Sequence, residues 1–316
     1  MKKNSKSKIL KLLVLLLLLV TITGCTQTLV DKDKKPVRNT VTGQNLTKNI
    51  LCQPKDKVII ELYEKNNIKI EKLPECTKFK INSGKYEGLW AGVFVKPLAF
   101  IIILIGKNIG NYALSLIIVS LLIRLIAYPL TKKTALQSEL MKKAQPELTR
   151  IQNKYKGKQD QASMMAQSQE MMAVYKKYNI NPLGGCLFAF IQLPLFIAFF
   201  EAVQRTPAIF EDSFLKLQLG TTPAVGIAGA YWYSYLILML LIAGSTFYAF
   251  TMTMKDTPSV EGAASMKKMP IIMSVLIIFM GFYMPSALGI YWVTTNVFTI
   301  IQNIIVKRSK EVNGKK

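Results

Sequence analysis

The chain has 316 residues, of which 51% are hydrophobic, and it carries a formal net charge of +23. A chain that is both apolar and strongly basic is typical of membrane spans joined by cationic loops, whose surface meets anionic lipid first. Nucleic acid is the rival explanation for the charge. The sequence contains no histidine, which excludes Ser-His-Asp triads, HExxH zinc sites and imidazole proton relays.

Residues 1–24 have the pattern of a signal peptide. Lysines precede the apolar run at 12–20, and Gly24 and Cys25 follow shortly after it, where cleavage is expected. This ending resembles a bacterial lipoprotein signal. We therefore expect Cys25 to become the first residue of the mature chain and to be lipidated with palmitate. An uncleaved membrane anchor is the alternative.

Residues 25–87 are polar and rich in lysine, and we expect them to form a lipid-anchored extracytoplasmic segment, either a small module or a tether. A pair of strands is predicted at 57–63 and 67–71. Cys52 and Cys76 flank these strands, and outside the cell they would form a disulfide, with lone thiols as the alternative. The cysteines do not have ligand spacing for a metal, so we expect neither a metal nor a cofactor.

The next apolar stretch, residues 88–110, is predicted to be an amphipathic helix in the outer membrane interface. Lys96 and Pro97 interrupt it and leave too few consecutive apolar residues for an ordinary span. Trp90 would then lie at the level of the headgroups, where tryptophan is enriched.

Five crossings are predicted from the longer apolar runs; they cover residues 111–131, 182–204, 231–253, 269–285 and 288–306. The positive-inside bias makes the basic segment 132–181, the loop 254–268 and the tail 307–316 cytoplasmic, and the loop 205–230 external. The expected fold class is an all-α polytopic membrane protein with a five-helix core.

Segment 132–181 is predicted to be an antiparallel helical hairpin, because its apolar residues recur at three- and four-residue spacing on both sides of Gly157. One interpretation is a docking element, in which the methionine-rich second arm adapts to its partner. The other is a solvated coiled-coil surface without a ligand.

Arg124 lies inside the first predicted span. An arginine at a helix centre costs about 2.5 to 3.5 kcal/mol on insertion scales, so its side chain is expected to face a wet cavity, a partner or an acidic ligand. Snorkelling to the nearer interface is the alternative.

Several linked motifs then resemble the YidC/Oxa/Alb family of membrane protein insertases. The motifs are Arg124 with Tyr128-Pro129-Leu130-Thr131, then Asn181-Pro182-Leu183-Gly184-Gly185-Cys186, then Gln192-Leu193-Pro194-Leu195-Phe196, then Pro285 to Trp292, and Asn296. The resemblance covers residues 89 to 310, and the lipoprotein-type start looks like the short members of single-membrane bacteria. It says nothing about residues 26–86.

The resemblance implies a hydrophilic groove, open to cytoplasm and lipid and closed outside, with the family's groove arginine at Arg124. Gln192, Trp292 and Asn296 are further groove candidates; Thr251 stands where relatives often carry a glutamine. Gln192 would alternatively make an interhelical hydrogen bond, and Trp292 would alternatively serve packing. Insertion makes and breaks no bond, so the chain is not expected to be an enzyme.

The expected partners are nascent membrane proteins, the Sec translocon, the ribosome through the hairpin and basic tail, and membrane lipids, with no contact to DNA. The expected location is a bacterial plasma membrane, with the lipid anchor outside and the C-terminus in the cytoplasm. The alternative from another class is a secondary transporter or channel for a small anion. An odd number of spans without an inverted repeat disfavours it.

Overall fold

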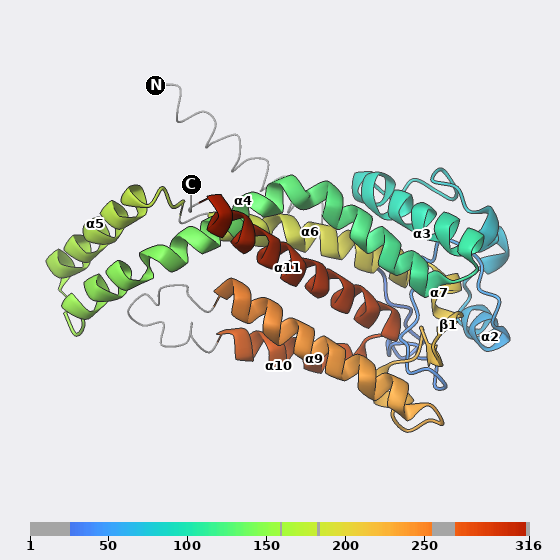
Figure 1. Cartoon of the computed structure of the whole chain (residues 1–316). Coiled ribbons are helices and arrows are strands. Elements are labelled where there is room, and N and C mark those ends of the chain that lie inside the picture. The colour runs from blue at the N-terminus through green and yellow to red at the C-terminus, as the bar shows by residue number, and fades with distance from the viewer. Residues whose placement is uncertain (1–25, 159, 182–183, 255–268, 314–316) are drawn as a thin grey trace. The chain divides into compact units, whose positions relative to one another are not determined.

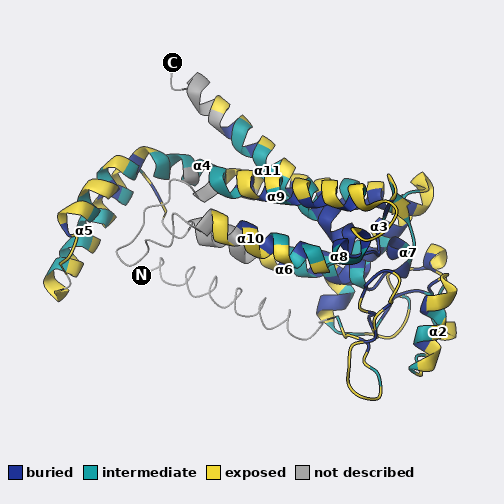
Figure 2. Cartoon of the chain, turned by 90° about the horizontal axis from the view of Figure 1, so that it is seen from below, coloured by how far each residue is buried: buried dark blue, intermediate teal, exposed yellow. Residues whose placement is uncertain are grey.

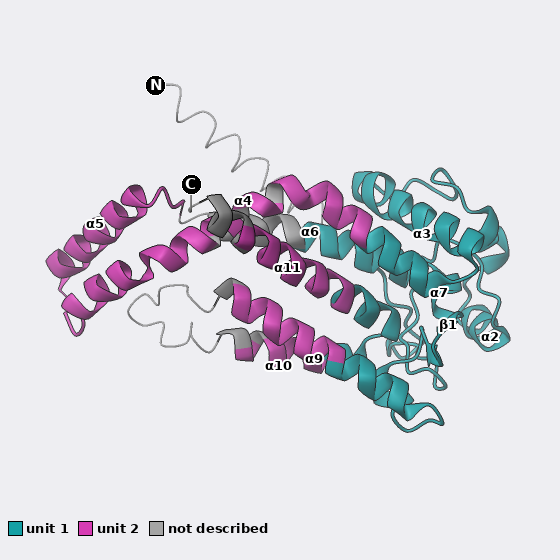
Figure 3. Cartoon of the chain, viewed as in Figure 1, with its two compact units in different colours: residues 1–120, 190–240, 280–292 teal, residues 121–189, 241–279, 293–316 magenta. Residues whose placement is uncertain are grey.

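The computed structural model describes residues 26–158, 160–181, 184–254 and 269–313 (Figure 1). The chain divides into two compact units (Figure 3). The first contains residues 1–120, 190–240 and 280–292, and the second contains residues 121–189, 241–279 and 293–316.

Helices make up most of the described chain. They are α2 (Lys57–Lys65), α3 (Lys96–Ile109), α4 (Tyr112–Lys154), α5 (Gln161–Lys177), α6 (Gly184–Gln204), α7 (Pro207–Phe210), α8 (Pro223–Gly226), α9 (Trp232–Met254), α10 (Met269–Tyr283) and α11 (Ser286–Asn313). Two short strands, β1 (Ser213–Phe214) and β2 (Leu217–Gln218), form an antiparallel ribbon in the loop after α7.

Four helical stretches of the described chain are long and apolar enough to cross a membrane: Ala91–Ile109, Tyr112–Pro129, Trp232–Met252 and Ser286–Val306. Shorter apolar stretches occur in α6 and α10. The expectation of a helical membrane protein is confirmed, while the count of five crossings and the interfacial position of α3 stay predictions.

Residues 26–87 form a folded unit, called here the N-terminal module. Isolated bridges join Thr28 to Thr47 and Arg38 to Asn45, and a disulfide joins Cys52 to Cys76. Seven buried apolar side chains make its core: Leu29, Val37, Leu46, Ile50, Ile59, Tyr63 and Ile70. Of the two alternatives for this segment, the structure therefore shows a module and not an unfolded tether.

The predicted pair of strands in this module is wrong. Lys57–Lys65 forms the helix α2, and Ile70–Lys72 forms a 3-10 turn. The carboxylate of Asp56 caps α2 by accepting a hydrogen bond from the amide of Val58 at 2.8 Å. Ile59 and Tyr63 are four residues apart and both are buried, which is helical spacing. The run begins with β-branched residues, which are typical of strands, and this led to the wrong prediction.

The module is bound to the C-terminal end of α6 and to the loop that follows it, all within the first unit. The guanidinium of Arg205 donates from Nε to the carbonyl of Asn49 at 2.7 Å, and the carbonyl of Arg205 accepts from the amide of Leu51 at 2.8 Å. Further along, the amide of Thr222 donates to the carbonyl of Thr42 at 2.8 Å. Main-chain atoms of the module thus take part directly in the fold around α6.

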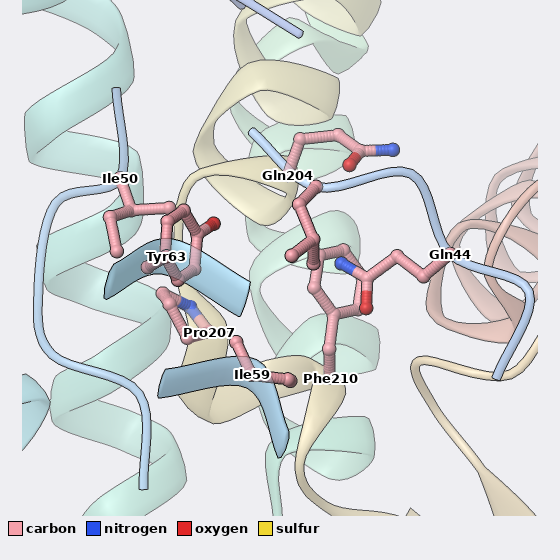
Figure 4. Close-up of a pocket in the computed structure, with 8 residues that line it drawn as sticks. Gln44, Ile50, Ile59, Tyr63, Gln204, Pro207 and Phe210 are labelled. Atoms are coloured by element: carbon pink, nitrogen blue, oxygen red, sulfur yellow. The ribbon is translucent and has the colours of Figure 1, made fainter. Parts of the chain in front are cut away.

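Apolar packing accompanies these hydrogen bonds. Figure 4 shows Ile50, Ile59 and Tyr63 of the module beside Pro207 and Phe210, which come from α7. The cavity among them measures about 10 Å³, which is close to the minimum that one water molecule needs. The module is therefore packed tightly here, and this cavity is too small for an organic ligand.

Trp90 precedes a π-helical turn, Ala91–Val95, that leads into α3. Its side chain is buried and donates from Nε1 to Oε1 of Glu201 at 3.0 Å, so the ring contacts protein and not headgroups, while the level of Trp90 in the membrane stays a prediction. A buried indole N–H needs an acceptor, and this carboxylate supplies it. Pro97 is the second residue of α3 and follows directly on the π-helical turn, within the continuous helical stretch Ala91–Ile109.

Candidate functional site

Arg124 is the charged side chain of interest in the second unit. Only 7% of its surface is exposed, whereas the next two residues, Leu125 and Ile126, are 58% and 80% exposed. The apolar neighbours therefore point outward and the guanidinium points into the protein. This orientation is opposite to what snorkelling along the outer surface of α4 would give.

Neutral polar side chains from other helices of the second unit are also buried or half-buried. The amide of Asn296 on α11 donates to the hydroxyls of Ser245 and Thr246 on α9 at 3.2 and 2.9 Å. Thr131 on α4 donates to the amide oxygen of Gln302 on α11 at 3.1 Å. Hydrogen bonds therefore connect α11 to both α4 and α9, and they lie in stretches of these helices that are otherwise apolar.

We call this group the polar set. Its members are Arg124, Thr131, Ser245, Thr246, Ser274, Thr295, Asn296 and Gln302. Each lies within an apolar helix, where a polar group is stabilised by a hydrogen-bond partner or by water. The polar set thus combines one guanidinium with several hydroxyl and amide groups, which can bind polar peptide atoms and carboxylates.

Three of the predicted groove residues, Arg124, Thr251 and Asn296, belong to this second unit. Asn296 is a member of the polar set, and Thr251 is half-buried on α9. Sequence reasoning missed Thr131, Ser245, Thr246, Ser274 and Gln302. The sequence could have indicated them, because each is a hydroxyl or amide residue inside a predicted span or at its end.

Trp292, the fourth candidate, lies at the end of the first unit and is half-buried in an aromatic cluster. Its ring meets Phe196 edge to face, with 5.4 Å between centroids. The neighbouring Tyr291 stacks on Phe199 at 4.1 Å. This arrangement favours packing as the role of Trp292. Gln192 belongs to α6, but its side chain lies outside the described part of the structure, and so does Cys25.

Glu201 and Arg205 lie one turn apart at the C-terminal end of α6, and both side chains are buried. Arg205 forms an ion pair with Glu87, while Glu201 accepts from Trp90. The carboxylate of Glu201 therefore lies inside the protein and not at its surface. In residues 26–158, 160–181, 184–254 and 269–313, no three His, Cys, Asp or Glu side chains are grouped to hold a metal.

The hairpin of the second unit consists of the end of α4 and α5. Its core contains Ala144, Leu148, Val174 and Ile180, all buried, and exposed side chains cover the outer side of α5 (Figure 2). The arms hold one another by two matching contacts, each made by a Lys-Tyr pair of one arm and a glutamate of the other.

In the first contact, Glu170 accepts from Lys154 at 2.5 Å and from Tyr155 at 2.8 Å. In the second, Glu147 accepts from Lys177 at 2.6 Å and from Tyr178 at 2.8 Å. The hydrogen bonds from the lysines, then those from the tyrosines, lower the pKa of both carboxyl groups. In each arm the glutamate precedes the Lys-Tyr pair at the same spacing. The glutamate of each arm binds the Lys-Tyr pair of the other arm, so the two contacts are reciprocal.

Comparison with known proteins gives the chain its family. The family model described as 60Kd inner membrane protein matches residues 104–314, and a relative in Listeria innocua is 34% identical over 220 residues. The chain belongs to the YidC/Oxa/Alb family. The match begins after the N-terminal module, so the module lies outside the part that defines the family.

The Listeria innocua relative, membrane protein insertase YidC 2, aligns over 69% of this chain and 72% of its own length. Membrane protein insertase MisCA of Bacillus subtilis is 36% identical over 219 residues, which are 69% of this chain and 79% of the relative. Membrane protein insertase YidC of Oceanobacillus iheyensis is 34% identical over 223 residues, which are 70% and 85% of the two chains.

A solved structure of an active YidC insertase with its first transmembrane domain resolved is similar in fold. It is 22% identical, with a TM-score of 0.51, and the match covers 77% of this chain and 52% of that chain. This chain therefore spans about half the length of that structure. The relatives named here are insertases, and the transporter or channel alternative receives no support from them.

Proposed function

We propose that this chain inserts integral membrane proteins and helps them fold, through a hydrophilic groove in which Arg124 is the positive charge. The observation that carries the proposal is the burial of that guanidinium within an apolar helix, in a unit that also holds the polar set. The names of the relatives support the same activity.

The physical step is the transfer of a polar outer tail through an apolar layer. A carboxylate or peptide carbonyl of the tail would bind Arg124 by a charge-assisted hydrogen bond, which lowers the cost of leaving water. Hydroxyl and amide groups of the polar set would solvate the remaining peptide atoms. The apolar segment of the substrate meanwhile enters lipid, where hydrophobic transfer drives it onward.

The partners follow from this role as proposals. Nascent membrane proteins are the substrates, the Sec translocon assists with larger ones, and the hairpin and the basic tail 307–316 contact the ribosome or anionic headgroups. Cys25 carries the lipid anchor outside a bacterial plasma membrane, and the C-terminus lies in the cytoplasm.

The test is insertion of a small single-spanning protein with an acidic outer tail into proteoliposomes that contain only this chain. Wild type is compared with Arg124→Ala and Arg124→Lys, and protection of the tail from external protease is measured. Arg150→Ala is the matched control, since it removes an exposed arginine of the hairpin. We expect Ala to fail, Lys to keep partial activity because it retains the charge, and the control to insert normally.

A substrate whose tail has glutamine in place of its acidic residues separates the two parts of the proposal. It should depend less on Arg124 if the guanidinium binds carboxylates. If Arg124→Ala inserts the acidic substrate as well as wild type does, the groove mechanism is wrong, and partitioning along the apolar helices explains insertion.

A further inference from the structure

The last loop of the N-terminal module, residues 80–86, is fixed to the protein along its whole length. Phe79 before it is buried, and Glu87 after it pairs with buried Arg205. Between these ends, buried Lys96 donates from Nζ to the carbonyls of Ser83 and Lys85 at 2.7 and 3.0 Å. A buried ammonium needs such acceptors, so these bonds hold both the lysine and the loop in place.

This fixed loop points its apolar side chains outward. Ile81 is 43% exposed and Tyr86 is 76% exposed, and Lys80 and Lys85 beside them are exposed as well. One exposed apolar residue needs no explanation, but this loop carries two of them and more follow directly in the chain. The loop contains no acidic residue.

More exposed apolar side chains follow in the chain, up to and along α3. Leu89 and Val93 are exposed just before the helix, and Ile101 and Leu104 are exposed along it. The opposite side of α3 is buried, as Ile102 shows. A helix that is apolar on both its buried and its exposed side contacts lipid with the second.

We propose that the loop 80–86 is a membrane anchor of the N-terminal module, with Ile81 and Tyr86 inserted into the outer leaflet and Lys80 and Lys85 at anionic headgroups. The hydrogen bonds from Lys96 hold the loop beside the start of α3, and the exposed apolar side of that helix selects lipid as the occupant. Tyrosine is enriched at the membrane interface, and the lysine stems reach headgroups from there. This contact goes beyond the insertion activity and is independent of it, but it rests on contact of α3 with lipid.

The experiment places the photo-cross-linking residue benzoylphenylalanine at Ile81 or Tyr86 in the full chain, reconstituted in nanodiscs of phosphatidylcholine and phosphatidylglycerol. Tyr233, exposed at the start of α9, is the site expected to touch lipid, and Glu64, exposed on α2, is the site expected to touch water. Phospholipid adducts are measured by mass spectrometry of the intact protein after illumination.

We expect adduct yields at Ile81 and Tyr86 to be several-fold above that at Glu64 and similar to that at Tyr233. Yields equal to that at Glu64 would overturn the proposal. Adducts that appear only with other proteins, when the chain is illuminated in native membranes, would overturn it too and assign the loop to a protein partner. None of these readouts requires insertion activity, so a failure of the groove mechanism leaves the test intact.

The headgroup contact is tested with Lys80→Gln/Lys85→Gln in the Tyr86 cross-linking chain. The share of phosphatidylglycerol among the adducts should fall to its share in the nanodisc, while the total lipid yield persists. An unchanged share would show that these lysines do not select anionic lipid.

Discussion

The disulfide of the N-terminal module should be a main source of its stability. Cys52 and Cys76 are buried and separated by 24 positions, and they connect the chain before α2 to the first residue of η2 (Cys76–Lys78). The core has only seven buried apolar side chains, and a core of that size rarely stabilises a domain without a covalent link. The perturbation that tests this is Cys52→Ala/Cys76→Ala.

The magnitude follows from the length of the closed loop. In the chain-entropy model, a link that closes about 25 residues removes about 12 cal/mol/K from the unfolded ensemble, or about 3.5 kcal/mol at room temperature. Since about 1.4 kcal/mol is a factor of ten, the opened population of the module should rise roughly 300-fold. Alanine leaves no unsatisfied polar atom at either position, so this loss is not increased by desolvation.

The assay is amide hydrogen exchange of the full chain in nanodiscs. The amides of Leu29, Val37 and Leu46 donate to main-chain carbonyls within the module at 2.8, 2.8 and 2.9 Å, so they exchange only when the module opens. Their exchange should accelerate by about the predicted factor, whereas amides of the second unit should not change. Cys186→Ala is the control, because that cysteine is not part of the disulfide.

An acceleration of less than roughly tenfold would refute the reasoning. It would mean that the module is held mainly by its contacts with Arg205 and Thr222, and that the disulfide adds little to its stability.

Two further predictions concern the second unit. Asn296→Ala should lower the free energy of unfolding in detergent by about 1 kcal/mol, because two interhelical hydrogen bonds of about 0.6 kcal/mol each are lost. Thr246→Val removes one of these bonds and should lower the free energy of unfolding by about half as much. If the losses of the two variants add up in the double variant, the two residues do not share a contact. In the hairpin, Glu147 and Glu170 have lowered pKa values, so the stability that their contacts supply is complete above the ordinary glutamate pKa and is lost as pH falls through the lowered values. Amide exchange of α5, corrected for its intrinsic pH dependence, should therefore accelerate on going from about pH 6 to about pH 3. The acceleration should be smaller in Glu147→Gln/Glu170→Gln. An equal acceleration in both chains would contradict a role of the two carboxylates in holding the hairpin.

The sequence predicts the long helices well, because an apolar run of membrane length leaves the main chain few alternatives. It also identifies Arg124, since a guanidinium in such a run is costly wherever its side chain points. It fails at Lys57–Lys65, where a short run with β-branched residues is compatible with both strand and helix. There the cap by Asp56 and the burial of Ile59 and Tyr63 decide the outcome.

The contacts of Trp90, Glu201 and Arg205 could not be predicted for a different reason. Trp90 and Glu201 are separated by 111 positions, and Arg205 is 156 positions from Asn49. Neither contact produces a periodic pattern in the sequence from which it could be predicted. An isolated tryptophan next to an apolar run suggests a membrane interface, and only the fold reveals that a carboxylate from another helix is the partner of its N–H.

The same long-range contacts explain how the N-terminal module can be ordered with so small a core. A segment of this size buries too little apolar surface to offset the entropy of ordering its main chain. Here part of the needed burial and hydrogen bonding comes from outside the segment, from Pro207, Phe210 and Thr222 in the chain that follows α6 and from Arg205. The module and the C-terminal end of α6 should therefore unfold together, and a chain lacking residues 26–87 should leave buried polar atoms of Arg205 without their partners. The module is for this reason a structural part of the first unit and not a flexible spacer.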